Sequence, residues 1–108
     1  MLQPFYVDPT VPLAHVLLAE ALLREEAEKK PEERDASVPQ RAAFLRKYGL
    51  KLLPPDDATL WSRAATSLAA QQDFPLALQA ADTALKLDPN SAEAKKARDA
   101  AMEGMKAQ

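Results

Sequence analysis

The sequence predicts an all-α protein, one small domain in which five helices follow one another without a strand. Alanine and leucine, both good helix formers, are abundant, while the 108 residues include only two glycines. The nine prolines divide the chain into segments of about helix length. Several of these segments carry apolar residues three and four positions apart, which is the spacing of one helix face.

The composition argues against several classes of protein. Hydrophobic residues make up 47% of the chain and charged residues 28%, which is typical of a globular domain rather than a disordered one. The net charge of −2 gives no general attraction to nucleic acid or to an anionic membrane. The absence of cysteine removes disulfides, thiol nucleophiles and cysteine-bound zinc, and it fits the cytoplasm.

We expect neither a secretory signal nor a membrane span near the N-terminus. No basic residue precedes the apolar stretch within residues 1–7, as a secretory signal would require. Residues 13–23 are apolar for about one helix length and include His15 and Glu20, so they are too short and too polar to cross a bilayer. The expected protein is therefore soluble and cytoplasmic.

Residues 1–11 are expected to form an extended N-terminal arm. Pro4, Pro9 and Pro12 each lack a backbone donor and push the preceding residue out of the helical conformation. The arm contains a possible docking segment for a helical groove of the same chain or of a second copy, namely Phe5, Tyr6 and Val7. The alternative is an arm that packs on its own domain or frays. An exchange of arms would produce a homodimer.

Residues 12–55 are predicted to form an N-terminal helical pair. The first helix spans about 12–30, with Thr10 as a plausible N-cap. Its apolar residues cover a wide arc, and its charged last turns are expected in solvent. The charged segment 25–35, interrupted by Pro31, is interpreted as a solvated helix end and loop, or alternatively as an acidic docking loop.

The second helix of this pair is predicted over 38–48. We expect Ser37 to cap it and Gly49 to end it. Its inward face is expected to consist of Ala42, Phe44, Leu45 and Tyr48. The leucines that follow, before a double proline, are expected to join the core: Leu50, Leu52 and Leu53.

Residues 56–108 are predicted to form a helical hairpin and a capping helix. The first helix of the hairpin is capped by Asp56 or Asp57 and runs to about residue 72. A turn at 72–75 places Pro75 at the start of the next helix, which ends near residue 87.

A last helix is predicted from about residue 90 to residue 106. The segment Asp88-Pro89-Asn90 breaks the preceding helix. Asn90 with Glu93 has the spacing of a capping box, although Ser91 can serve as the cap instead.

Aromatic, small and proline residues recur over residues 58–91 in a regular pattern: Trp61, Ala64, Ala65, Leu68, Phe74, Ala77, Ala81, Ala84 and Pro89. This pattern resembles one tetratricopeptide repeat, a 34-residue helix–turn–helix unit. The residues that match at the family's spacing are Trp61, Ala77, Ala84 and Pro89. The departures towards plain small or aliphatic residues are Ala64, Ala65, Leu68 and Ala81. The resemblance implies a right-handed array of helical hairpins whose partners are other proteins.

The spacing also has a direct physical meaning. Small residues on both helices of the hairpin let the two backbones approach closely, namely Ala65, Ala77, Ala81 and Ala84. Trp61 and Leu68 flank this seam and supply buried area. The last helix has a weaker apolar stripe that can lie on the hairpin: Ala94, Ala97, Ala101 and Met105. It is expected to be a terminal cap. For the first two helices the sequence leaves two alternatives, a degenerate repeat or a helical pair that is not a repeat.

No set of residues predicts catalysis. His15, the single histidine, lies in the most apolar helix and is interpreted as a structural side chain. Gly49 and Gly104 alone cannot form a phosphate-binding loop, and the carboxylates lack metal-ligand spacing. We therefore expect no enzymatic activity, no cofactor and no metal site.

A protein-binding face is the remaining candidate site. Partners of tetratricopeptide proteins generally lie in a groove lined by the first helix of each pair. Carried over to this chain, the resemblance implies the partner-binding residues Thr59, Ser62, Arg63, Thr66, Ala69 and Ala70. These mostly small and neutral side chains suit a helix or an apolar segment better than the terminal carboxylate of a peptide. The alternative is that the first two helices of the same chain fill this groove.

The predicted function is an adaptor or co-chaperone-like module that holds a helix or an extended segment of another protein. The alternative is a structural subunit whose helical hairpin drives homo-oligomerisation. The high content of alanine, leucine, proline and arginine suggests a GC-rich, bacterial source.

Overall fold

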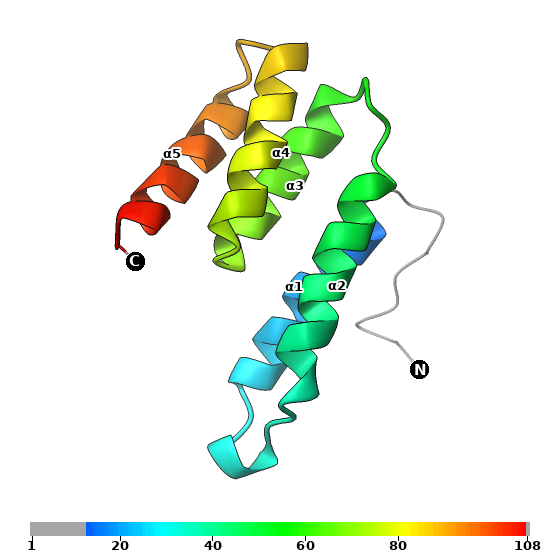
Figure 1. Cartoon of the computed structure of the whole chain (residues 1–108), viewed down its shortest axis with the longest axis vertical. Coiled ribbons are helices and arrows are strands. Elements are labelled where there is room, and N and C mark those ends of the chain that lie inside the picture. The colour runs from blue at the N-terminus through cyan, green and yellow to red at the C-terminus, as the bar shows by residue number, and fades with distance from the viewer. Residues whose placement is uncertain (1–12, 108) are drawn as a thin grey trace.

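A computed structural model describes residues 13–107 and confirms the all-α prediction (Figure 1). The helices are α1 (Ala14–Ala27), α2 (Ser37–Lys51), α3 (Ala58–Ala70), α4 (Phe74–Leu87) and α5 (Ala92–Ala107), with a short 3-10 turn, η1 (Pro31–Glu33), between α1 and α2. No strand occurs in this part of the chain. In Figure 1, α1 and α2 form an antiparallel hairpin, and α3, α4 and α5 form a second group beside its upper end.

Aspartates cap both helices of the α3–α4 hairpin, and the cap of α3, Asp57, is one of the two residues predicted for it. The carboxylates of Asp57 and Asp73 each accept the backbone N–H three residues later, at 3.2 and 3.4 Å. Pro75 lies in the first turn of α4, where a missing N–H leaves no hydrogen bond unmade. Gln72, between the helices, has a φ of 65°, the left-handed conformation that often ends a helix. The last residue of α3 is Ala70, two residues earlier than predicted.

Alanines line the seam between α3 and α4. None of the seam alanines has exposed surface: Ala64, Ala65, Ala77, Ala80, Ala81 and Ala84. Leu68 is fully buried beside them, and Trp61 is half-buried with its Nε1 donating to the carbonyl of Pro54 at 2.8 Å. The close antiparallel pair expected from the alanine spacing is therefore present.

α5 packs on α3 and α4 through a second alanine stripe, consisting of Ala94, Ala97 and Ala101. Ser91 rather than Asn90 caps this helix, because the Ser91 hydroxyl accepts the N–H of Ala94 at 3.2 Å. Near the other end, Gly104 lies directly on the ring of Phe74, where a Cβ would collide. The alanine stripe and the contact of Gly104 with Phe74 hold α5 against the α3–α4 hairpin, while Ser91 caps the start of α5.

α2 begins one residue earlier and ends three residues later than predicted. Gly49 does not end the helix but lies in its last turn. A glycine is needed at this position because α1 crosses α2 closely here. A Cβ at Gly49 would be 2.9 Å from Cγ2 of Val16 and 3.0 Å from Cβ of His15. Ser37 is the first residue of α2 rather than its cap, and its backbone N–H donates to the carboxylate of Asp35 at 2.9 Å.

The inward face of α2 differs from the expected one. Ala42 is buried and Leu45 is partly buried, but Phe44 and Tyr48 are 66% and 44% exposed. The close crossing at Gly49 fixes the rotation of α2 against α1, and this rotation turns both aromatic rings outward. Of the leucines that follow, two are buried and one is exposed, namely Leu50 and Leu53 against Leu52.

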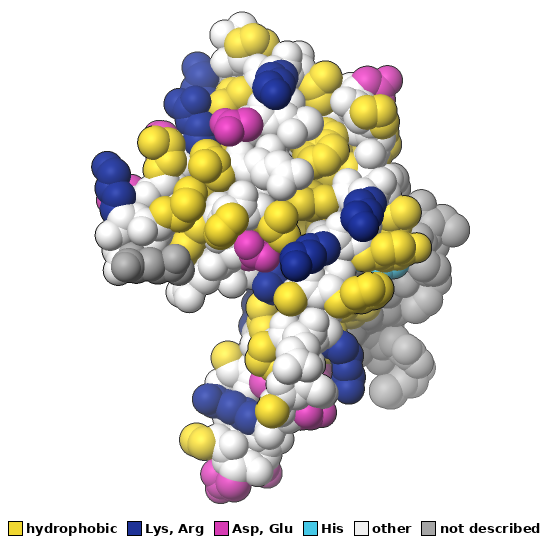
Figure 2. Space-filling view, viewed as in Figure 1, with side chains coloured by type: hydrophobic (Ala, Val, Ile, Leu, Met, Phe, Trp, Pro, Cys, Tyr) yellow, Lys and Arg dark blue, Asp and Glu magenta, His cyan; other side chains and the backbone are white. Residues whose placement is uncertain are grey.

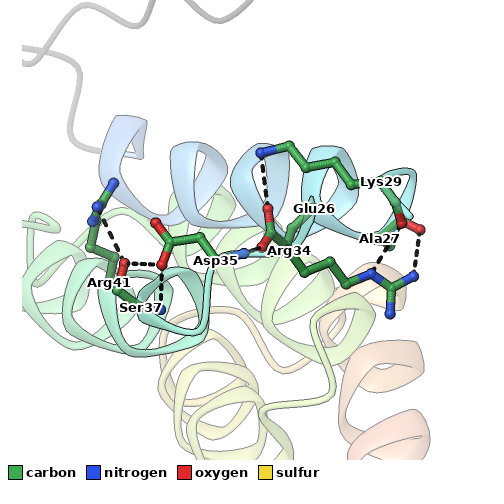
Figure 3. A network of polar contacts seen from close by, with 7 residues as sticks. All are labelled: Glu26, Ala27, Lys29, Arg34, Asp35, Ser37 and Arg41. Atoms are coloured by element: carbon green, nitrogen blue, oxygen red, sulfur yellow. Dashed lines mark hydrogen bonds and ion pairs between the residues drawn. The ribbon is translucent and has the colours of Figure 1, made fainter. Parts of the chain in front are cut away.

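Side-chain hydrogen bonds organise the loop between α1 and α2 (Figure 3). Arg34 donates to the carbonyls of Ala27 and Lys29, at 3.2 and 3.1 Å. Glu26 is buried, accepts the backbone N–H of Asp35 and pairs with Lys29 at 3.2 Å. α1 ends three residues before its predicted end. The charged segment was expected to lie in solvent, but Glu26 within it is buried.

An ion pair joins α2 to the turn between α3 and α4. Nε of Arg46 donates to Oδ2 of Asp73 at 2.7 Å, and its NH1 group donates to Oε1 of Gln71 at 3.1 Å. The side chains of Arg46 and Asp73 are only 12% and 18% exposed, so water screens this pair weakly. The contact holds the α1–α2 hairpin against the group formed by α3, α4 and α5.

Candidate partner-binding groove

A groove follows the seam between α1 and α3. Two adjoining hollows of about 370 and 410 Å³ form it, and they share Glu20 and Ala70. Its α1 wall consists of Leu13, Leu17, Glu20, Leu23, Arg24 and Ala27. Its α3 wall consists of Arg63, Thr66, Ser67, Ala70 and Gln71. At a rise of 1.5 Å per residue, the α1 wall is about 20 Å long.

Polar side chains hold the two walls together at the floor of the groove. Oγ of Ser67 donates to Oε1 of Glu20 at 2.6 Å, and Nε2 of Gln71 donates to the carbonyl of Val16 at 3.1 Å. The two contacts are one helical turn apart on both helices, so they fix the register of α1 against α3. Arg24 also donates to Glu20, at 2.7 Å, so this carboxylate is held from both sides.

The first turn of α5 closes one end of the groove. The hydroxyls of Ser62 and Thr66 lie 3.3 Å from the carboxylate of Glu93, and each also lies closer to a backbone carbonyl, at 2.9 and 3.1 Å, which competes for its single proton. The negative charge of Glu93 also complements the positive end of the α5 dipole. The dipole therefore favours a carboxylate at this end.

Of the six residues of α3 that were predicted to bind a partner, only half line the groove. Three of them line the groove, namely Arg63, Thr66 and Ala70. Thr59 is exposed near the start of α3 but does not line the groove. Ser62 is only 3% exposed and Ala69 packs against the core, so neither offers a surface to a partner.

Sequence reasoning missed the α1 wall and the α5 end of the groove, namely Leu13, Leu17, Glu20 and Glu93. The spacing of Leu13, Leu17 and Glu20 does place them on one side of a helix. The apolar arc of α1 is too wide, however, to show which side faces solvent. α1 packs against part of the α3 face, at Ser67 and Gln71, and forms the second wall of the groove beside it.

A third hollow, separate from the groove and about 380 Å³ in volume, lies between α2 and the α3–α4 pair. Its apolar lining consists of Leu50, Trp61 and Leu76, and its polar lining of Lys47, Lys51 and Gln79. Figure 2 shows hydrophobic side chains in this region between α4 and the upper end of α2, with basic side chains on the α2 side. This hollow is compact and lacks the length of the groove.

His15 occupies a packed position between α1 and α2. Its ring meets the ring of Tyr48 edge-on, with centroids 5.2 Å apart. Its Nδ1 is buried and has no hydrogen-bond partner in residues 13–107. Over the same residues, no group of three or more His, Cys, Asp or Glu side chains could hold a metal ion.

Two other sequence predictions concern the N-terminal region and membrane insertion. The expected arm with its docking residues Phe5, Tyr6 and Val7, and the N-cap Thr10, lie outside the described residues. Among the helices that are described, none is both long enough and apolar enough to span a bilayer.

No protein-family model, curated protein or solved structure matches this chain. The tetratricopeptide resemblance therefore stays a prediction from the sequence. The candidate site rests on the geometry of α1, α3 and α5.

Proposed function

We propose that this chain is a non-enzymatic, cytoplasmic protein-binding module of the tetratricopeptide type, with an adaptor or co-chaperone-like role. Its partner is a helix or an extended segment of another protein. The observation that carries this proposal is the groove between α1 and α3, which is open to solvent and about 20 Å long. A groove of this length matches about four turns of a partner helix.

The chemistry of the groove supports a partner with apolar side chains on one face. Leu17 is 44% exposed on the α1 wall, and Ala70 on the α3 wall leaves room for an incoming side chain. Burial of apolar surface contributes roughly 25 cal/mol per Å², so such contacts supply most of the affinity. Arg63 is exposed and offers a basic contact to an acidic side chain of the partner. An amphipathic helix presents this combination through residues three and four positions apart.

The α3–α4 hairpin supports the comparison with a tetratricopeptide repeat. Its alanines form the close seam that the repeat pattern requires, and Trp61 is packed beside it. α5 covers the hairpin with alanines and turns Lys95, Lys96 and Asp99 to solvent, as a terminal cap would.

Ala70→Arg tests the proposal. Ala70 is exposed and borders both hollows, so an arginine fills the groove without entering the core. Ala100→Arg is the matched control, because it adds the same side chain at an exposed position of α5. Wild-type protein is used to capture partners from the source organism, and each purified partner is then titrated against all three proteins.

We expect Ala70→Arg to weaken binding by at least about tenfold, or 1.4 kcal/mol, and Ala100→Arg to leave the Kd unchanged. Circular dichroism melting of both variants checks that the fold is intact. Equal affinity of the Ala70→Arg variant and the wild type would place the binding site outside the groove.

A further inference from the structure

The outer face of α2 carries three exposed hydrophobic side chains in one row. Phe44, Tyr48 and Leu52 follow one another at intervals of four residues and are 66%, 44% and 41% exposed. The rings of Phe44 and Tyr48 are stacked, with centroids 5.8 Å apart and planes 7° from parallel. Figure 2 shows hydrophobic side chains on this side of α2. We name these three residues the aromatic stripe.

The described part of the chain begins beside the aromatic stripe. His15, in the first turn of α1, contacts the ring of Tyr48, and Leu13 is only two residues before it. From Phe44 to Leu52, the C-cap of α2, the stripe rises over eight residue steps, or about 12 Å. The eight residues 5–12 can span about 26 Å when extended, so Phe5 can reach any part of the stripe without a change in α1.

Charge and chemistry match residues 4–8 to this face. α2 has no acidic residue and carries three exposed basic residues, Arg41, Lys47 and Lys51, in addition to Arg46, which pairs with Asp73. Residues 1–12 contain one acidic residue, Asp8, and no lysine or arginine. The segment before Asp8 is apolar and aromatic, and the prolines at positions 4 and 9 favour an extended conformation. An extended aromatic segment can cover a flat row of rings through stacked and edge-on contacts.

We propose that residues 4–8 dock on the aromatic stripe of the same chain, with Phe5 and Tyr6 against Phe44 and Tyr48. Asp8 then lies near the basic side chains of α2. The exposed rings of α2 and the aromatic residues of the arm are two halves of one small apolar cluster. This interaction is separate from the groove, so the two proposals can fail independently.

Disulfide trapping tests the docked position, because the native chain has no cysteine. The test pair is Gln3→Cys with Gln40→Cys, since Gln40 is exposed one turn before Phe44 and residue 3 precedes Phe5. The control pair is Gln3→Cys with Lys96→Cys, at an exposed position of α5. A tethered segment has a millimolar effective concentration, so the test pair should close on the order of a hundredfold faster than cross-links between chains at micromolar protein.

The expected product is a monomeric, internally cross-linked chain that forms from the test pair at a rate independent of protein concentration. A disulfide between two chains would overturn docking within one chain and indicate exchange of arms. Equal oxidation rates of the test and control pairs would overturn docking on α2.

A melting cycle gives a second measurement that needs no cysteine. Phe5→Ala and Phe44→Ala should each lower the Tm by about 4 °C, because each removes an aromatic contact between the same two surfaces. The double variant should melt close to either single variant. Leu87→Ala, at an exposed position of α4, is the control, and its effect should add to that of Phe5→Ala. Additive effects of Phe5→Ala and Phe44→Ala would contradict the proposal.

Discussion

The α3–α5 group and the α1–α2 hairpin both bring helices close together, but they do so with partly different side chains. In the α3–α5 group, buried alanines recur along all three helices. In the hairpin, Ala14, Ala19 and Ala42 are also buried, and Gly49 adds a point where α1 lies too close for a Cβ. The alanine seam extends along whole helices, whereas the glycine contact is confined to one turn.

This difference determines how each region keeps its position. A long seam distributes the packing energy over many contacts, so α3, α4 and α5 hold one another directly. The hairpin exposes Phe44 and Tyr48. It depends in addition on the loop network around Glu26 and on the pair of Arg46 with Asp73. We therefore expect changes in the seam to affect the whole fold, and changes in the hairpin to have smaller effects.

Ala81→Phe should have the largest effect. Ala81 has no exposed surface, and the α3–α4 seam leaves no space for a ring. Overpacking of a core usually costs 1–3 kcal/mol, and a ring forced between two backbones should cost about 3 kcal/mol or more, a large part of the stability of a small domain. Ala77→Glu should have a similar effect, because it buries a charge without a partner. Thermal melting by circular dichroism measures both losses.

The control for this prediction is Ala100→Phe, at an exposed position of α5. This variant should melt like the wild type. If Ala81→Phe also melted like the wild type, α3 and α4 could not be in contact through their alanines, and the comparison between the two regions would lose its basis.

The predictability of the fold differs between the same two regions. Asp57 and Pro75 are local signals with one common structural meaning, so the start of each helix in the α3–α4 hairpin could be predicted. Gly49 has two possible meanings, a helix end or a close crossing, and the sequence alone does not choose between them. That choice also sets the rotation of α2, which explains why Phe44 and Tyr48 were expected inside.

The ion pair between the two regions should have an intermediate effect. Asp73→Asn keeps an N-cap of similar strength but removes the charge that faces Arg46. Because the pair is mostly shielded, we expect a loss of about 1–2 kcal/mol, between the values for exposed and buried pairs. Asp57→Asn is the matched control, since Asp57 caps α3 without an ion pair in the described residues.

A double-mutant cycle with Arg46→Met isolates the interaction from the loss of packing. The free energy of unfolding from urea titration should give a coupling energy of about 1 kcal/mol between Arg46 and Asp73. A coupling energy near zero would mean that this ion pair does not help to hold the α1–α2 hairpin against the α3–α5 group.

The candidate site was predictable on one wall only. The repeat pattern places Arg63, Thr66 and Ala70 on one side of α3, and the structure finds all three in the groove. The α1 wall depends on the angle at which the hairpin meets α3. Contacts between distant parts of the chain set this angle, such as Ser67 with Glu20, and no local pattern encodes it.

The smallest effect is expected for a substitution in the loop between α1 and α2. Ser37 donates its backbone N–H and its hydroxyl to Asp35, at 2.9 and 2.8 Å (Figure 3). These hydrogen bonds, the backbone one first, lower the pKa of Asp35 below its usual value. Because the pKa is lower in the folded state, the carboxylate stabilises the fold above its usual titration range. This contribution is lost as the pH falls through the folded pKa, below about pH 4.

Asp35→Asn should therefore lower the Tm slightly at neutral pH, and the difference from the wild type should shrink below about pH 4, where the wild-type carboxyl is protonated. Asp99→Asn, at an exposed position of α5, controls for the change in net charge. Parallel melts over a pH series measure both differences. If the Tm difference between Asp35→Asn and the wild type stayed constant with pH, the charge of Asp35 would not contribute to the stability of the loop. The hairpin would then depend on Gly49 and Arg46 for its position, and its contrast with the alanine seam would become sharper.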